Sequence, residues 1–252
     1  MERRNRQQIE GLNQRGGRTL SIVDLLLAGT IDVETAAHVG EAVGRGASFL
    51  TAANPGGAGK TALLAALLGF LPAGVPIVTV DRPDVIAAAT ETGGPECCLA
   101  HEIGSGHWYG YIWGPVVGRY LDLAAHGRMV ASCLHADTME EVQDVLHACT
   151  IGDPLGALKG IDFVLFMHVE SSPAGHRRWV TGVYERDETS RTYEPAFLRD
   201  PRRDCFERLG DSPNTRAREL SEFLRELAER GIREFGEVRS AYVDFIRGAG
   251  RG

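Results

Sequence analysis

Short apolar runs alternate with amphipathic segments along the first 150 residues of the chain. The apolar runs have the length and composition of buried strands, and the longer segments between them repeat apolar residues at helical spacing. The strands that this pattern predicts are 48–53, 77–80, 96–103 and 128–134, and the helices are 21–27, 32–43, 62–68, 113–125 and 138–147. Regular alternation of strand and helix is typical of an α/β fold, in which helices cover a mostly parallel sheet.

Capping signals locate the ends of several of these helices. Ser21 is followed three residues later by Asp24, a capping-box spacing, and Asp32 precedes the next helical segment. Pro115 is tolerated in the first turn of the helix at 113–125. Either Asp137 or Thr138 caps the helix that ends near His147.

The pattern changes after residue 160. Runs at 162–169, 178–184 and 192–195 are separated by Gly, Pro and Ser breaks and predict an antiparallel extension of the sheet. From 214 to 246 the chain has the pattern of two charged amphipathic helices, joined near Gly231 or Gly236. We interpret these as a helical tail with a solvated face.

Residues 1–18 carry more arginine than acid and show no apolar periodicity. Arginine stands at positions 3, 4, 6, 15 and 18, and the acids of this stretch are Glu2 and Glu10. Such a segment is expected to be a basic disordered arm. The predicted organisation is this arm, then a core at 19–210 with linker-like helices at 21–44 and the antiparallel extension at 160–197, then the tail at 211–252.

Composition narrows the class of protein. The chain has 252 residues, 43% of them hydrophobic and 24% charged, as is usual for a globular protein, and its net charge of −7 disfavours a nucleic-acid binder. No signal peptide is recognisable, and no apolar run approaches the roughly 18 residues of a membrane span. We expect a cytoplasmic protein in which Cys97, Cys98 and Cys133, which lie in strand-like runs, are buried thiols.

A glycine-rich turn between the strand at 48–53 and the helix at 62–68 carries the clearest chemical signal. Its sequence is Asn54-Pro55-Gly56-Gly57-Ala58-Gly59-Lys60-Thr61-Ala62. In such a phosphate loop (Walker A), backbone N–H groups surround an anion, the lysine reaches the β- and γ-phosphates, and the Thr hydroxyl binds Mg²⁺. Asn54 replaces the usual first glycine, and asparagine tolerates a left-handed backbone best among the other residues. The predicted ligand is ATP with Mg²⁺.

Three predicted strands end in polar residues that suit phosphate chemistry. They are Asp81, Glu102 and His135. The carboxyl ends of parallel strands share one edge of a sheet, so all three side chains are expected near the phosphate loop. Glu102 would hold Mg²⁺ together with Thr61 or activate water, Asp81 would assist it, and His135 would sense the γ-phosphate. Each residue also has a structural alternative. Asp81 would start a turn, Glu102 would be an exposed acid at a strand end, and His135 would only satisfy hydrogen bonds.

With these residues in place, residues 20–204 resemble the secretion ATPases, the hexameric motors of type II and type IV secretion and pilus assembly. Pro55 matches the loop of that family, and residues 78–81 resemble its acidic box. Residues 127–136 resemble its histidine box, G-H-x-x-x-S-T-L-H-A, and 175–180 resemble the strand pair after the core. The resemblance implies a RecA-like core, a homo-oligomer such as a hexamer, and membrane-associated secretion or pilus machinery at the inner face of the membrane.

Departures from the family lie mainly around the Walker B strand. The family reads P-D-x-I-x-x-G-E-x-R, and residues 95–104 align with it on Glu102 but place His101 and Gly104 at the glycine and arginine positions. An insertion containing Trp108 follows. An alternative alignment moves Walker B to 111–115, where no catalytic acid would be present. We also expect a divergent member that lacks the family's N-terminal domain.

The sequence therefore predicts an Mg²⁺-dependent motor-type ATPase. A nucleotide-binding adaptor that hydrolyses ATP weakly or not at all is the alternative, and a nucleic-acid-handling ATPase is a weaker third. An arginine that stabilises the transition state is expected from a neighbouring subunit. Arg82, Arg177 and Arg178 are the candidates for this role, and the sequence assigns none of them.

Overall fold

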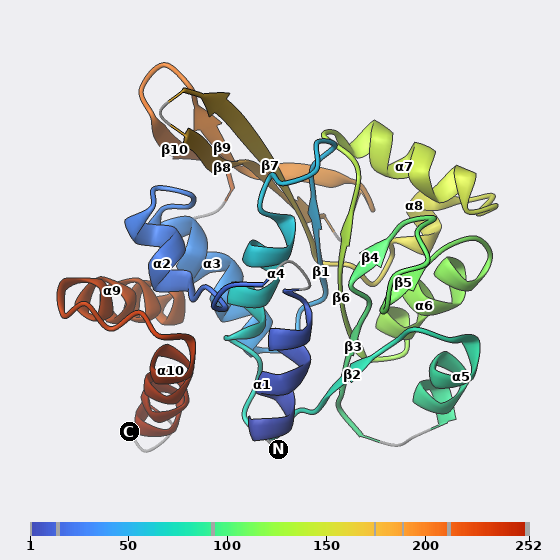
Figure 1. The fold of residues 1–252 in the computed structure, drawn as a ribbon, viewed down its shortest axis with the longest axis horizontal. Helices are drawn as coiled ribbons and strands as arrows, with labels where there is room; N and C mark the ends of the chain where they lie inside the picture. The colour runs from blue at the N-terminus through green and yellow to red at the C-terminus, as the bar shows by residue number, and fades with distance from the viewer. Residues whose placement is uncertain are drawn as a thin grey trace.

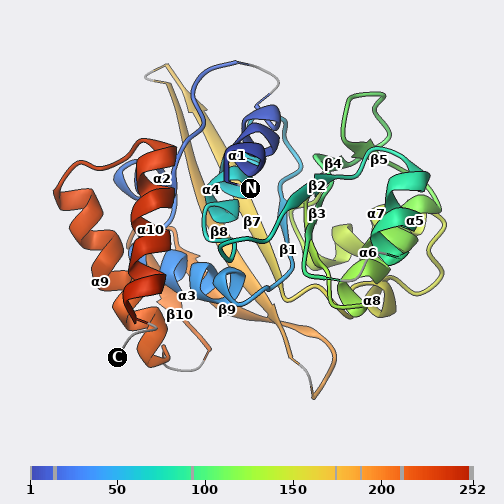
Figure 2. The same cartoon turned by 90° about the horizontal axis from the view of Figure 1, so that it is seen from below.

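The computed structural model describes residues 2–13, 16–91, 94–173, 175–187, 189–210 and 213–249. Its centre is one sheet with the strand order β10-β9-β8-β7-β1-β6-β3-β2, and helices lie on both sides of it (Figures 1 and 2). The parallel strands are β1 (Phe49–Ala52), β2 (Ile77–Thr79), β3 (Cys97–Leu99), β6 (Met129–Leu134) and β7 (Phe163–Ser172). The predicted α/β fold with a parallel core is confirmed.

Antiparallel strands extend the sheet after β7, as predicted. They are β8 (Gly175–Arg186), β9 (Tyr193–Asp200) and β10 (Cys205–Arg208), of which β10 was not predicted. The predicted strand at 96–103 is interrupted: β3 ends at Leu99, and a separate short strand, β4 (Glu102–Ile103), pairs with β6 and with β5 (Tyr111–Ile112).

Two buried clusters, one on each face of the sheet, form the core. Neighbouring residues of one strand belong to different clusters, as with Phe49 and Leu50 of β1 or Cys97 and Cys98 of β3, because successive side chains of a strand point to opposite faces. One face is covered by α1 (Glu2–Gly11), α2 (Ile22–Leu27), α3 (Val33–Gly44), α4 (Lys60–Leu68), α9 (Thr215–Glu229) and α10 (Phe235–Ala249); the other is covered by α5 (Pro83–Glu91), α6 (Val116–Ala125), α7 (Met139–Ala148) and α8 (Pro154–Ala157).

The predicted caps are present. Ser21 Oγ accepts from the N–H of Asp24, whose carboxylate accepts from the N–H of Ser21 in return. Asp32 caps α3, and of the two candidates for α7 it is Thr138 whose hydroxyl accepts from the helix. These caps start the helices where the sequence places them.

Residues 2–11 form a helix, so the prediction of a disordered arm at 1–18 is wrong there; Arg15 lies outside the described residues. The Asn5 side chain donates to the carbonyl of Val75 (2.7 Å) and accepts from the N–H of Ile77 (2.9 Å), which lie before and in β2. Ile9, one turn further along α1, is buried in the core. Because a polar side chain makes the docking contacts, a search for apolar periodicity misses this helix.

The C-terminal helices are also part of the main core. Leu220, Leu224 and Leu227 of α9 are buried in the same cluster as α3 and α4, and Phe235 and Tyr242 of α10 join them. Two amphipathic helices are confirmed at this end of the chain, and they pack onto the core as well as facing solvent. Helices α5 and α8 were not predicted.

Tyr120 of α6 connects the helix layer to the neighbouring strands β3 and β6. Its fully buried hydroxyl accepts from the N–H of Ala100 (3.1 Å) and faces the carbonyls of Cys98 (3.1 Å) and Ala131 (2.8 Å). We expect Tyr120→Phe to lower the free energy of unfolding by about 1–3 kcal/mol, since buried polar groups then lose a partner. Urea unfolding would measure this.

Tyr109→Phe is the matched control, because Tyr109 is 57% exposed. An unfolding free energy of Tyr120→Phe equal to that of the control would contradict the structural role of this hydroxyl.

Candidate functional site

The glycine-rich loop connects β1 to α4 at the carboxyl edge of the sheet, as the sequence predicts. Gly57 and Gly59 have positive φ angles of 85° and 99°, which glycine adopts without strain. A Cβ at Gly59 would lie 3.1 Å from Met167 Cε and 3.3 Å from Arg178 Cδ. The loop therefore needs glycine at position 59 for its conformation and for its close contact with β7 and β8.

Lys60, the first residue of α4, is held at the inner side of this loop. Its side chain is buried, and its ammonium group donates to the carbonyl of Ala53 (2.9 Å) and lies 3.4 Å from His135 Nδ1. The hydroxyl of Thr51 donates to the carbonyl of Lys60 (3.2 Å), which fixes the start of α4 to β1. The cation is thus positioned at the end of β1.

Glu102 and His135 meet in front of Lys60. His135 Nε2 lies 2.8 Å from Glu102 Oε1, and His135 Nδ1 lies 2.6 Å from the carbonyl oxygen of Asn54. The hydroxyl of Tyr111 donates to Glu102 Oε2 (3.0 Å). Strand β6, which His135 follows directly, lies between β1 and β3, so the histidine bridges the loop and the acid.

Two residues of this network were not predicted. Asp137 accepts from the N–H of Asn54 (2.7 Å) and so fixes the position that replaces the usual first glycine. Its place two residues after His135 could have suggested it. Tyr111 reaches Glu102 from the insertion after β4, and no sequence signal would have pointed to it.

A cleft of about 800 Å³ opens beside these residues. The loop and the start of α4 (residues 56–62) form one side, and the opposite side carries Glu102, His135, His101, Tyr111 and Trp108. Ile9 and Leu12, from α1 and the residue after it, contribute an apolar wall, so the unexpected N-terminal helix also shapes the cleft. Of the nine residues predicted for the loop and the helix entrance, all but Asn54 and Pro55 line the cleft.

Asp81 is not among the residues that line this cleft, contrary to the sequence-based expectation. The reason is the strand order: β6 and β3 separate β2 from β1, a distance of roughly 14 Å at the usual strand spacing of about 4.8 Å. Asp81 lies near His101 instead. Burial lowers the pKa of His101 to about 4, and the charge of Asp81 acts in the opposite direction.

The competing alignment places Walker B at 111–115, where β5 lies. Glu102 begins β4, which pairs with β6, the strand next to β1, whereas β5 pairs with β4 alone. Glu102 therefore occupies the position that faces the loop.

Two side chains of the cleft offer oxygen ligands for a magnesium ion. Within the described residues, no group of three or more His, Cys, Asp or Glu side chains could hold a metal. Thr61 and Glu102 both line the cleft, and Mg²⁺ is commonly held by one or two such oxygens together with substrate phosphates. The side chains fit an ion that arrives with a nucleotide.

The cysteines lie mainly in the interior of the protein. All five are free, and Cys97, Cys98, Cys133 and Cys149 are buried, as predicted for the first three, while Cys205 is exposed. Burial raises the pKa of Cys98 and of Cys133 to about 12, so both stay protonated thiols.

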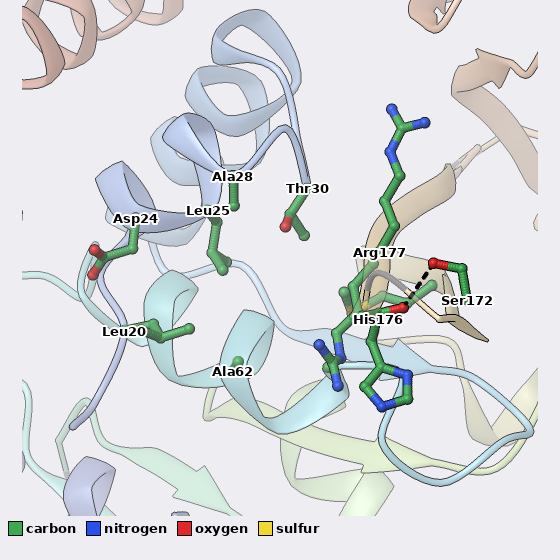
Figure 3. A pocket seen from close by; sticks show the side chains of 13 residues that line it. Leu20, Asp24, Leu25, Ala28, Thr30, Ala62, Ser172, His176 and Arg177 are labelled. Atoms are coloured by element: carbon green, nitrogen blue, oxygen red, sulfur yellow. Dashed lines mark hydrogen bonds between the residues drawn. The ribbon is translucent and has the colours of Figure 1, made fainter. Parts of the chain in front are cut away.

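A second cavity of about 530 Å³ lies on the other side of the loop (Figure 3). Leu20 and residues of α2 (Asp24, Leu25) form one side, and Ser172, His176 and Arg177 of the β7–β8 hairpin form the other. The two cavities share Leu20, Gly59, Ala62 and Arg178, which therefore stand at their junction.

The fold and the cleft together define an α/β protein with a glycine-rich anion loop facing an acid and a histidine. Among solved structures, the chain is similar to the VirB11 ATPase of the Brucella suis type IV secretion system, determined in complex with sulphate, with 17% identity and a TM-score of 0.47 over 67% of this chain and 55% of that one. It is also similar to the ATPase DotB of Legionella pneumophila, with 14% identity and a TM-score of 0.43 over 75% of this chain and 54% of that one.

The chain thus spans about half the length of these two proteins. No family model matches it, and no curated protein does. The expected resemblance to secretion ATPases is found as a structural similarity over most of the chain, at low identity. Within the described residues, no helix combines the length and the apolar character needed to cross a bilayer.

Proposed function

We propose that this protein is an Mg²⁺-dependent ATPase that works as a motor of a secretion or pilus-assembly type. The observation that supports it best is the convergence of Lys60, His135 and Glu102 on one cleft beside the glycine-rich loop. A phosphate-binding loop, a buried cation, an acid and a polar contact for the γ-phosphate are the parts that nucleoside triphosphate hydrolysis requires.

Each residue has a role that follows from its position. The loop N–H groups and Lys60 would bind the phosphates. Glu102 would position water and accept its proton, and Tyr111 would hold the carboxylate through its second oxygen. His135 contacts both the acid and the carbonyl of Asn54, so it would register whether a γ-phosphate is present. A magnesium ion held by Thr61 and Glu102 would neutralise phosphate charge.

An adaptor that binds ATP without turning it over is the second candidate. Asn54 departs from the loop pattern, and Lys60 is held by the carbonyl of Ala53. Phosphates would have to displace this contact. In an adaptor, the Glu102–His135 pair would only signal that nucleotide is bound and would take no part in hydrolysis.

We further propose that the working form is a homo-oligomer, a hexamer in its simplest version, at the cytoplasmic face of a membrane-associated machine. If subunits share catalytic groups, ATP turnover per subunit should rise with protein concentration. We expect this rise together with a ring-sized species in light scattering when ATP and Mg²⁺ are added.

ATP binding by calorimetry and phosphate release, measured across a concentration series, would test these proposals together. A monomer that binds ATP without turnover would favour the adaptor. A monomer with concentration-independent turnover would contradict the oligomeric motor, and absence of ATP binding would contradict both candidates.

A further inference from the structure

Arg178 of β8 contacts the phosphate loop directly, although it lies 121 residues away in the sequence. Its Nε donates to the carbonyl of Gly57 at 2.6 Å. Its aliphatic stem lies against Gly59, where a Cβ would come within 3.3 Å of Arg178 Cδ. The residue is half-buried, and its backbone pairs in register with Val169 of β7. The arginine is therefore held against the loop by the sheet itself.

Arg178 also stands where the two cavities meet. It lines the cleft with Glu102 and the cavity beside α2 alike. A guanidinium group has five N–H donors in a rigid fork, and the bond to Gly57 uses one of them. If the phosphates of a ligand lie in the loop and the rest of the ligand extends toward α2, the ligand passes beside the guanidinium group of Arg178.

The two other candidate arginines form ion pairs. Arg177 also lines the cavity beside α2, but its guanidinium group pairs with Asp204 (2.5 Å) and lies 5.4 Å from the ring of Trp179. Arg82 pairs with Asp84 at 3.2 Å.

We infer that Arg178 is a phosphate-binding residue of the nucleotide site, supplied by the same chain as the loop. This rests on the proposed function. Its fork holds the Gly57 carbonyl with one N–H and contacts phosphate oxygens of the nucleotide with others, which is the geometry for which arginine is suited. Binding would thereby couple the phosphate loop to β8 and the antiparallel part of the sheet.

Three variants of Arg178 distinguish a phosphate contact from simple support of the loop. Arg178→Gln keeps an N–H donor for Gly57 and loses the charge, Arg178→Lys keeps the charge without the fork, and Arg178→Ala loses both. Calorimetry with ATP and with ADP, in the presence of Mg²⁺, would measure the affinities, and thermal melts would verify folding. Arg203→Gln is the control for the loss of a positive charge, because Arg203 is exposed in the turn between β9 and β10, where it pairs with Asp200 (3.6 Å), and it lines neither cavity.

We expect Arg178→Gln and Arg178→Ala to weaken ATP binding about 10- to 100-fold, the range of a hydrogen bond to a charged group, with Arg178→Lys in between and Arg203→Gln unchanged. ATP affinity of Arg178→Gln equal to that of the wild type would overturn the inference and leave only loop support. An equal loss in Arg203→Gln would overturn it too, since the loss of affinity would then reflect the overall positive charge of the protein and not a contact made by Arg178. Absence of ATP binding by the wild type would instead contradict the proposed function.

Discussion

Replacing Lys60 by alanine is expected to weaken ATP binding at least about 100-fold, because charge-assisted bonds to phosphate oxygens are lost together. Lys60 is only 6% exposed, and its ammonium group is already directed to the end of β1 beside His135. The loop amides would remain, so residual weak binding is compatible with the expectation. Isothermal titration with ATP and Mg²⁺ measures the affinity directly.

Lys159→Ala provides the control for the loss of a positive charge. Lys159 is an exposed lysine that pairs with Asp122 at 3.2 Å, away from the loop. Its variant should bind ATP as the wild type does. An unchanged affinity in Lys60→Ala, with the fold intact by circular dichroism, would rule out the phosphate-loop interpretation.

Replacing Glu102 by glutamine is expected to separate binding from turnover. The amide keeps the size of the side chain and an oxygen that can accept from Tyr111, but it cannot take a proton from water. Loss of a general base typically lowers the rate by 10²–10⁴-fold. ATP affinity should stay within a few-fold of the wild type, while phosphate release in a single-turnover assay falls by that factor.

Glu140→Gln, on the exposed face of α7, is the matched control and should change neither quantity. Full turnover in Glu102→Gln would remove Glu102 from the chemistry and reopen the identity of the catalytic acid. If the wild type binds ATP without turnover, the adaptor gains support, and Glu102→Gln should then alter only the pairing with His135.

The parts of the fold that the sequence predicts are those with local signals. Strands with continuous apolar runs and helices with caps such as Ser21 and Asp32 appear at or near their expected places. The glycine-rich loop is equally local, since its residues are contiguous. Glu102 and His135 could be predicted to meet because both follow parallel strands that end at one edge of the sheet.

The parts that could not be predicted depend on contacts between distant segments. Asp81 does not line the cleft because β6 and β3 lie between β1 and β2, and the sequence alone does not reveal this strand order. The contact of Arg178 with Gly57 joins residues far apart in the chain. The side-chain amide of Asn5 holds helix α1 against β2, although asparagine is a residue type usually found at the surface.

The docking of α1 has a consequence for how this sheet meets other molecules. β2 is the last strand on its side, and the outer hydrogen-bonding groups around Ile77 and Val75 are taken up by a helix side chain. An open edge invites pairing with a strand of another chain, which leads to domain swapping or aggregation. Asn5 thus blocks that edge. A shortened protein that begins at Arg18 would expose the unpaired backbone groups of β2 to other chains.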